Sequence, residues 1–134
     1  MRPPVFLSVA NILYLHADTI LTEGGGDGIR DLALLESATL MPQQKFADRY
    51  LHPDLPSMAA AYLNHLCTNH PFVDGNKRVG AIAAYAFLDL NGYALDASAT
   101  EFEETVMRLA AGELSKAELT RWFHAHAGSH QDGF

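Results

Sequence analysis

Apolar residues recur at helical spacing through most of the chain. A helix is expected over residues 8–21, with Ser8 as its N-cap. The glycine-rich stretch 24–28 stops that helix and predicts a flexible connector. A second helix is expected over residues 31–40, because Pro42 cannot continue a helix.

The middle of the chain predicts two more helices after a polar segment. Residues 43–54 lack a helical period and indicate either a loop or a short β-hairpin. Apolar residues three and four apart predict a helix from Pro56 to Asn69. The stretch from Arg78 to Asn91 is apolar on most sides, so we expect it to be the central, most buried helix.

Two capping boxes predict the last two helices. Ser98–Glu101 begins a helix that runs to about Ala111, and Ser115–Glu118 begins a final helix. The tail 128–134 is expected to fray. The sequence therefore predicts an all-α fold of about six helices, with a β-hairpin at most.

Composition narrows the class of protein. The chain has 134 residues and no long linker, which predicts one domain over 1–134 with a core of about 6–126. Its formal net charge of −7 is a poor match for direct binding of nucleic acid. No segment reaches the roughly 18 apolar residues of a membrane span, and the N-terminus lacks a signal-peptide pattern. We therefore expect a cytoplasmic protein without a membrane partner.

One short stretch, residues 70–78, stands apart in its chemistry. It reads His-Pro-Phe-Val-Asp-Gly-Asn-Lys-Arg, lies between two apolar helices and begins the second. Each polar residue alone would more often be a turn or surface residue. Together, at the start of a helix, they predict a site that handles phosphate.

The last four residues of this stretch suit an anion. The first N–H groups of a helix have no internal partner, and the helix dipole favours a phosphate there. Gly75 allows close approach of the backbone, and Lys77 and Arg78 add positive charge. Asn76 is expected either to bind a phosphate oxygen or to fix the loop.

The remaining residues predict a reaction. Asp74 would repel phosphate unless a Mg²⁺ ion joins its carboxylate to the phosphates. His70 can take a proton from an attacking hydroxyl near neutral pH. Phe72 is apolar within a polar loop, so we expect it to anchor the loop in the core.

At these positions the chain resembles the Fic/Doc superfamily, whose signature is His-x-Phe-x-Asp/Glu-Gly/Ala-Asn-Gly/Lys-Arg. Lys77 stands where Fic adenylyltransferases have glycine, and Ala81 stands where they have a second arginine. Both positions resemble the death-on-curing (Doc) toxins of toxin–antitoxin modules. Gly75, where Doc itself has alanine, is closer to the Fic form.

The resemblance implies an enzyme that modifies proteins. A Doc-like member transfers a phosphate from ATP to a protein hydroxyl, with elongation factor Tu as the implied target, and arrests translation. The alternative within the family is a transferase that attaches AMP or another nucleoside monophosphate. An alternative outside it is a non-catalytic module that binds an anion or a partner.

The resemblance also implies sites for a target and an inhibitor. Residues 43–54 occupy the place of the family's flap, which pairs with an extended target segment. Its candidate target contacts are Lys45, Arg49, Tyr50 and His52. Many members are inhibited by a helix with Ser/Thr-x-x-x-Glu-Gly/Asn. Residues 19–24 fit that pattern but end a helix at a glycine stop, so we expect a separate antitoxin instead.

Overall fold

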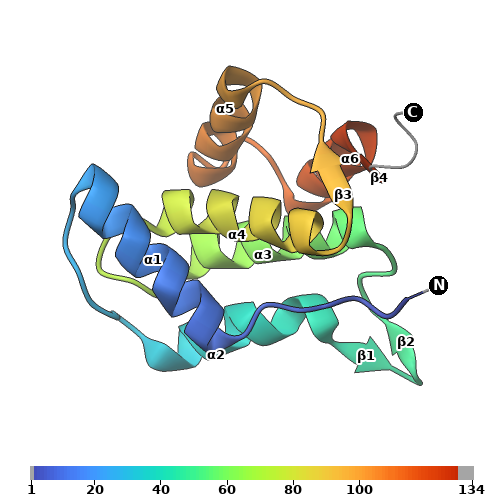
Figure 1. Ribbon diagram of the computed structural model, residues 1–134, viewed down its shortest axis with the longest axis horizontal. Coiled ribbons are helices and arrows are strands. Elements are labelled where there is room, and N and C mark those ends of the chain that lie inside the picture. Colours follow the sequence, from blue (N-terminus) through green and yellow to red (C-terminus); the bar gives the residue numbers. More distant parts are fainter. Residues whose placement is uncertain (1, 130–134) are drawn as a thin grey trace.

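The computed structural model describes residues 2–129, and this range is mostly helical (Figure 1). The helices are α1 (Val9–Glu23), α2 (Leu32–Leu40), α3 (Leu55–Asn69), α4 (Asn76–Leu90), α5 (Ala99–Ala110) and α6 (Lys116–His126), with a 3₁₀ turn over Met41–Gln43. The strands are β1 (Lys45–Phe46), β2 (Arg49–Tyr50), β3 (Tyr93–Leu95) and β4 (Ala127–Ser129). The predicted all-helical class with six helices is confirmed over the described residues.

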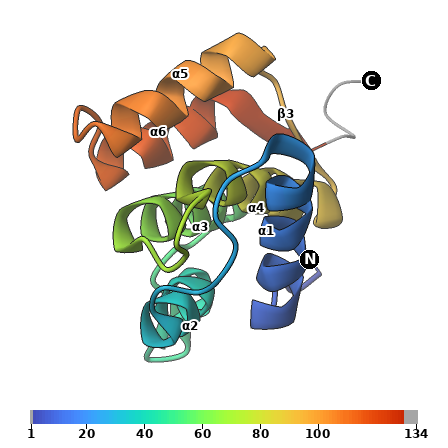
Figure 2. The same cartoon turned by 90° about the vertical axis from the view of Figure 1, so that its left-hand side faces the viewer.

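The helices lie in three layers. Figure 2 shows α3 and α4 in the middle, α5 and α6 on one side, and α1 and α2 on the other. None of the helices in residues 2–129 is long and apolar enough to cross a lipid bilayer.

The central helix is α3, not α4, which corrects the prediction from hydrophobicity. Helix α3 packs against α2, α4 and α6, and its side chains from Pro56 to Leu63 are all buried. Helix α4 has one face in solvent, where Ile82, Tyr85 and Leu90 are 36%, 55% and 53% exposed. An apolar helix can therefore still lie at a surface.

Side-chain caps explain most of the helix starts. The capping boxes predicted at Ser98 and Ser115 are both formed, and Ser8 caps α1 as expected. Helix α4 begins at Asn76, earlier than the predicted Arg78. Its N-cap is Gly75, with a left-handed φ of 79° and no side-chain hydrogen bond.

The strands form two small antiparallel sheets. Residues 43–54 contain the hairpin alternative, with Lys45 opposite Tyr50 across β1 and β2. Strands β3 and β4 were not predicted, and they pair Tyr93 with Ser129. Gly128 and Ser129 are therefore held in a sheet and not frayed, while the rest of the predicted tail, 130–134, lies outside the described residues.

Candidate active site

His70 ends α3 and lies at the surface. Its backbone is left-handed, with φ 49° and ψ 54°, and this turns the chain from α3 into the loop that precedes α4. The Arg30 guanidinium donates from Nε to the His70 carbonyl at 2.5 Å and from Nη2 to the Asn69 carbonyl at 2.8 Å. Arg30 therefore binds the free carbonyls at the end of α3 and fixes the backbone of His70.

Phe72 and Asn76 hold the loop in shape. Phe72 is 1% exposed, which places its ring in the core as predicted. The Asn76 side chain accepts from the Phe72 N–H at 3.0 Å and donates to the Phe72 carbonyl at 3.1 Å. Of the two roles that the sequence left open for Asn76, the structure therefore supports fixing the loop.

Asp74 presents an exposed carboxylate that is kept ionised. Its Oδ2 accepts from the Gly26 N–H at 3.2 Å, and its Oδ1 accepts from the Gly75 N–H at 2.8 Å. These backbone hydrogen bonds, with a smaller contribution from Arg78, lower the pKa of Asp74. Each oxygen keeps a second lone pair, so this carboxylate fits a Mg²⁺ ion that takes its other ligands from phosphate and water.

The start of α4 lies open beside this carboxylate. Asn76, Lys77 and Arg78 form its first turn, so their N–H groups have no partner within the helix. Lys77 and Arg78 are both exposed. The positive end of the helix dipole thus lies in the same turn as two exposed cations, at the predicted phosphate site.

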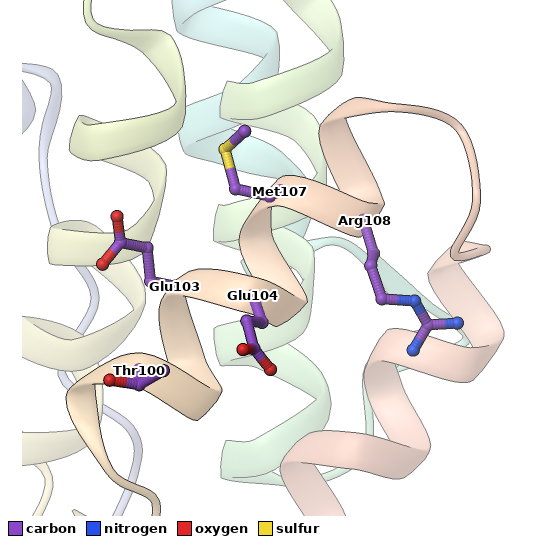
Figure 3. Close-up of a pocket in the computed structure, with 5 residues that line it drawn as sticks. All are labelled: Thr100, Glu103, Glu104, Met107 and Arg108. Atoms are coloured by element: carbon purple, nitrogen blue, oxygen red, sulfur yellow. The ribbon is translucent and has the colours of Figure 1, made fainter.

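Lys77 extends from the site toward α5. Its Nζ lies 3.8 Å from the Sδ of Met107. Met107 also lines a hollow of about 430 Å³ on the exposed face of α5, with Thr100, Glu103, Glu104 and Arg108 (Figure 3). The hollow therefore lies beside the motif and not over it.

The glycine-rich connector between α1 and α2 packs along the motif loop. Gly28 accepts from the Val73 N–H at 3.1 Å, and Ile29 forms an antiparallel bridge with Phe72. The N–H groups of Arg30 and Asp31 both donate to the Pro71 carbonyl, at 2.8 and 3.0 Å. The connector predicted as flexible is therefore hydrogen-bonded to the motif.

Helix α1 supplies two side chains that the sequence interpretation did not assign to the site. The ring of buried His16 stacks on that of Phe72, with centroids 3.7 Å apart. Glu23 is the last residue of α1, and its carboxylate oxygen Oε2 lies 3.6 Å from Nε of Arg78. The pattern over residues 19–24, which we set aside in favour of a separate antitoxin, thus brings its glutamate to a motif arginine.

The flap does not lie at the motif. The β1–β2 hairpin precedes α3, whereas His70 follows it, and Figure 1 shows the hairpin at the far end of the helix. Because α3 has 15 residues, its ends lie about 22 Å apart. A target segment paired with the hairpin would have to extend over that length to reach His70.

The four predicted flap contacts divide into two kinds. Lys45 and Arg49 are exposed, and Lys45 Nζ lies 4.7 Å above the ring of Tyr50. The Tyr50 ring also packs against the protein, since its centroid lies 5.7 Å from that of the Phe6 ring. His52 is 8% exposed, which leaves little of its side chain for a target.

His52 instead joins a polar cluster between α3 and α6. Its Nε2 lies 2.8 Å from Nζ of Lys116, which also lies 3.0 Å from Nε2 of His65. Burial and then the Lys116 charge lower the pKa of His52, and the same causes lower that of His65 to about 4. His52 therefore anchors the base of the hairpin to α6.

Comparison with known proteins supports the family that the motif indicates. The model of the Fic/DOC family matches residues 6–88, a range that contains all of the 70–78 loop as well as His16 and Glu23. A protein of Mycolicibacterium smegmatis named Toxin Doc is 42% identical over 89 residues, which cover 63% of this chain and 68% of that protein. Members of this family are protein-modifying enzymes. The chain belongs to the Fic/DOC family.

Proposed function

We propose that this chain transfers a phosphate from ATP to a hydroxyl group of a protein and acts as the toxin of a toxin–antitoxin module. One observation carries the proposal. The start of α4 has no side-chain cap, and it lies beside exposed Asp74, Lys77 and Arg78 in a loop fixed by hydrogen bonds.

The residues divide the reaction among them. His70 takes the proton of the target hydroxyl, whose oxygen attacks the γ-phosphorus of ATP while the bond to ADP breaks. The N–H groups of Asn76 to Arg78, with the charges of Lys77 and Arg78, bind the phosphates and stabilise the negative charge. Asp74 would hold Mg²⁺, which neutralises phosphate charge when bound.

Two positions favour transfer of phosphate over transfer of AMP. Lys77 adds a cation and a long side chain where the adenylylating relatives have glycine. Ala81 removes the second arginine of those relatives, on the following turn of α4. Both differences disfavour a pose that presents the α-phosphate to the hydroxyl.

The partners follow from the similarity to a protein named Toxin Doc. The proposed target is elongation factor Tu, and the proposed inhibitor is a short antitoxin whose tail folds onto the toxin. An antitoxin carboxylate could compete with Glu23 for Arg78, because that existing pair is half exposed and 3.6 Å long.

Intact-mass analysis of the target tests the reaction. Elongation factor Tu incubated with the wild-type chain, ATP and Mg²⁺ should gain the mass of one phosphate group. His70→Ala or excess EDTA should prevent the gain. A gain of AMP would replace the kinase by the nucleotidyltransferase alternative, and no gain on this target or on a bacterial extract would favour the non-catalytic module.

Growth curves test the toxin role separately. Induced expression of the wild-type chain should arrest bacterial growth, and His70→Ala at equal soluble level should not. Equal growth of both strains would contradict the toxin role and leave the transfer chemistry standing.

A further inference from the structure

Two parts of the chain outside the motif hold Asp74 in place. The Asp74 backbone carbonyl lies 2.7 Å from Nε2 of His16 on α1, and its Oδ2 accepts from the N–H of Gly26 in the connector. The first contact fixes the main chain of Asp74 and the second fixes its carboxylate. Neither residue belongs to the motif.

His16 is itself held firmly. It is 3% exposed, and its ring lies nearly parallel to that of Phe72, at an angle of 6°. Because a carbonyl oxygen only accepts, Nε2 of His16 must carry the hydrogen in this contact. A Cβ at Gly75 would lie 3.5 Å from the same Nε2, so the imidazole also packs against the N-cap of α4.

Gly25 is constrained by its approach to Asp74. A Cβ at position 25 would lie 2.8 Å from Oδ2 of Asp74, closer than real Cβ atoms come to other heavy atoms. Gly24 has a similar left-handed backbone, with φ +83° against +117° for Gly25, but a Cβ there would meet nothing within 4 Å. The two neighbours therefore differ in whether a side chain reaches Asp74.

We infer that His16, Gly25 and Gly26 are positioning residues that hold Asp74 in the orientation in which it binds a divalent cation. This inference rests on the proposed function, because it assigns the cation-binding role to Asp74. It adds that cation binding by Asp74 also requires residues of α1 and of the glycine-rich connector.

The physical reason is the strict geometry of the cation. Mg²⁺ requires near-octahedral oxygen ligands at short distances, so a rotated carboxylate binds it poorly. Groups that orient a metal ligand typically change metal affinity 10- to 100-fold when they are removed. The hydrogen bonds from Gly26 and Gly75 leave one lone pair of each Asp74 oxygen directed elsewhere.

The main test compares Gly25→Ala with Gly24→Ala in the full chain. Titration calorimetry measures the affinity for ATP with and without Mg²⁺, and the ratio of the two affinities reports the contribution of the cation. Gly25→Ala should lower the ratio on the order of tenfold. Gly24→Ala should keep it, although both substitutions strain a left-handed backbone. An unchanged ratio in Gly25→Ala, or an equal fall in Gly24→Ala, would overturn the inference.

His16 provides a second pair of variants. His16→Phe keeps a flat ring against Phe72 but removes the donor to Asp74, whereas His16→Gln keeps an N–H donor. The affinity ratio should fall in His16→Phe and be largely retained in His16→Gln. Equal ratios in the two variants at equal thermal stability would remove His16 from the positioning role.

A measurement without nucleotide separates this inference from the proposed function. Asp74→Asn should move the ¹H–¹⁵N signal of Gly26 in the ligand-free wild-type and Gly24→Ala backgrounds, but much less in the Gly25→Ala background. A wild-type chain that binds no ATP would contradict the proposed function, whereas a Gly26 signal unmoved by Asp74→Asn would contradict the positioning contact.

Discussion

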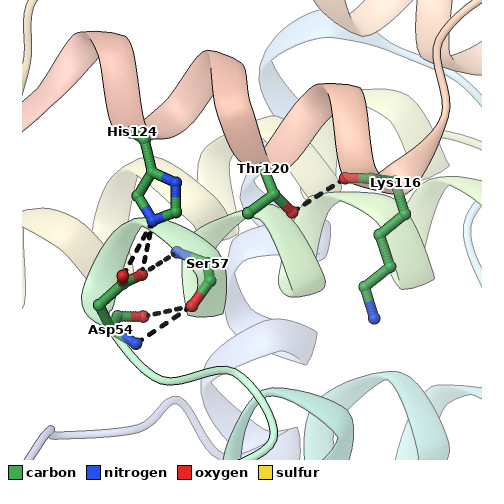
Figure 4. A network of polar contacts seen from close by, with 5 residues as sticks. All are labelled: Asp54, Ser57, Lys116, Thr120 and His124. Atoms are coloured by element: carbon green, nitrogen blue, oxygen red, sulfur yellow. Dashed lines mark hydrogen bonds and ion pairs between the residues drawn. The ribbon is translucent and has the colours of Figure 1, made fainter.

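The starts of α3 and α4 differ in what binds the free N–H groups of the first helical turn. At the start of α3, Asp54 accepts from the Ser57 N–H at 2.9 Å, the Asp54 N–H donates to the Ser57 hydroxyl at 3.2 Å, and His124 of α6 lies 2.9 Å from the carboxylate (Figure 4). At the start of α4, no side chain of residues 2–129 caps the helix. The N–H groups at the first start are bound within the protein, and those at the second are where we propose that phosphate binds.

Among the six α-helices of the described residues, only α4 lacks a side-chain N-cap. The other five helices in the described range each have a side-chain N-cap, from Ser8, Asp31, Asp54, Ser98 and Ser115. Such a cap typically contributes about 1 kcal/mol to stability. Helix α4 lacks that contribution where it bears Lys77 and Arg78, which is the expected arrangement if its start binds phosphate as proposed.

The largest effect is expected at His70. His70→Ala should lower the rate of transfer about 10²- to 10⁴-fold, because the attacking hydroxyl loses its general base. The affinity for ATP should change little, since the imidazole acts on the hydroxyl and not on the phosphates. Single-turnover kinetics and calorimetry measure the two quantities, and full activity in the variant would remove His70 from the mechanism.

The next effect is expected at Arg78. Arg78→Ala should weaken ATP binding tenfold or more, because a hydrogen bond between charged groups contributes roughly 1.5–3 kcal/mol. Arg121→Ala, which removes an equal charge from an exposed position on α6, is the matched control. If calorimetry finds the same loss in both variants, the effect is one of net charge and not of a phosphate contact.

At the start of α3, where Asp54 caps the helix, a substitution should change only the stability of the protein. Asp54→Ala should lower the free energy of unfolding by about 1 kcal/mol and leave ATP affinity unchanged. Burial alone would raise the pKa of Asp54, but hydrogen bonds from Ser57 and the contact with His124 outweigh it and lower the pKa.

The lowered pKa of Asp54 determines how its contribution to stability changes with pH. A carboxyl with a lowered pKa contributes stability above its unfolded pKa of about 4, and this contribution is lost as the pH falls through the folded pKa. The difference in stability between wild type and Asp54→Ala should therefore shrink in acid. Urea unfolding at several pH values measures it, and a difference that grows in acid would be the opposite of the expected result.

The smallest effect is expected at Glu23. Glu23→Ala should free Arg78 and tighten ATP binding about two- to fivefold, because half-exposed ion pairs contribute little. Asp18→Ala removes the same charge from an exposed position of α1 and should have no such effect. Weaker binding in Glu23→Ala would mean that the carboxylate supports the site and does not block it.

Local signals explain what the sequence could predict. Ser98 and Ser115 were identified because a cap and its partner lie three residues apart, and the loop was identified because its chemistry is contiguous. The β3–β4 pair was missed because its short strands are distant in the sequence. His16 was missed for a similar reason: a single histidine on a helix gives no sign that it will meet Asp74.

Glu23 and His52 are two further residues whose contacts could not be predicted from the sequence. The pattern that contains Glu23 was visible, but only the packing of α1 on α4 brings its carboxylate to Arg78. His52 was assigned to a surface flap because sequence does not reveal that Lys116 of α6 lies beside it. In both cases the missing information was a contact between segments that are distant in the sequence.

The most direct test of phosphate binding at the start of α4 is an NMR titration of the ligand-free chain with ATP and Mg²⁺. The ¹H–¹⁵N signals of Asn76, Lys77 and Arg78 should shift at saturation, because their N–H groups are the free donors of α4. The signal of Ser57, whose N–H is bound by Asp54, should stay in place. Shifts at Ser57 with none at residues 76–78 would contradict the account.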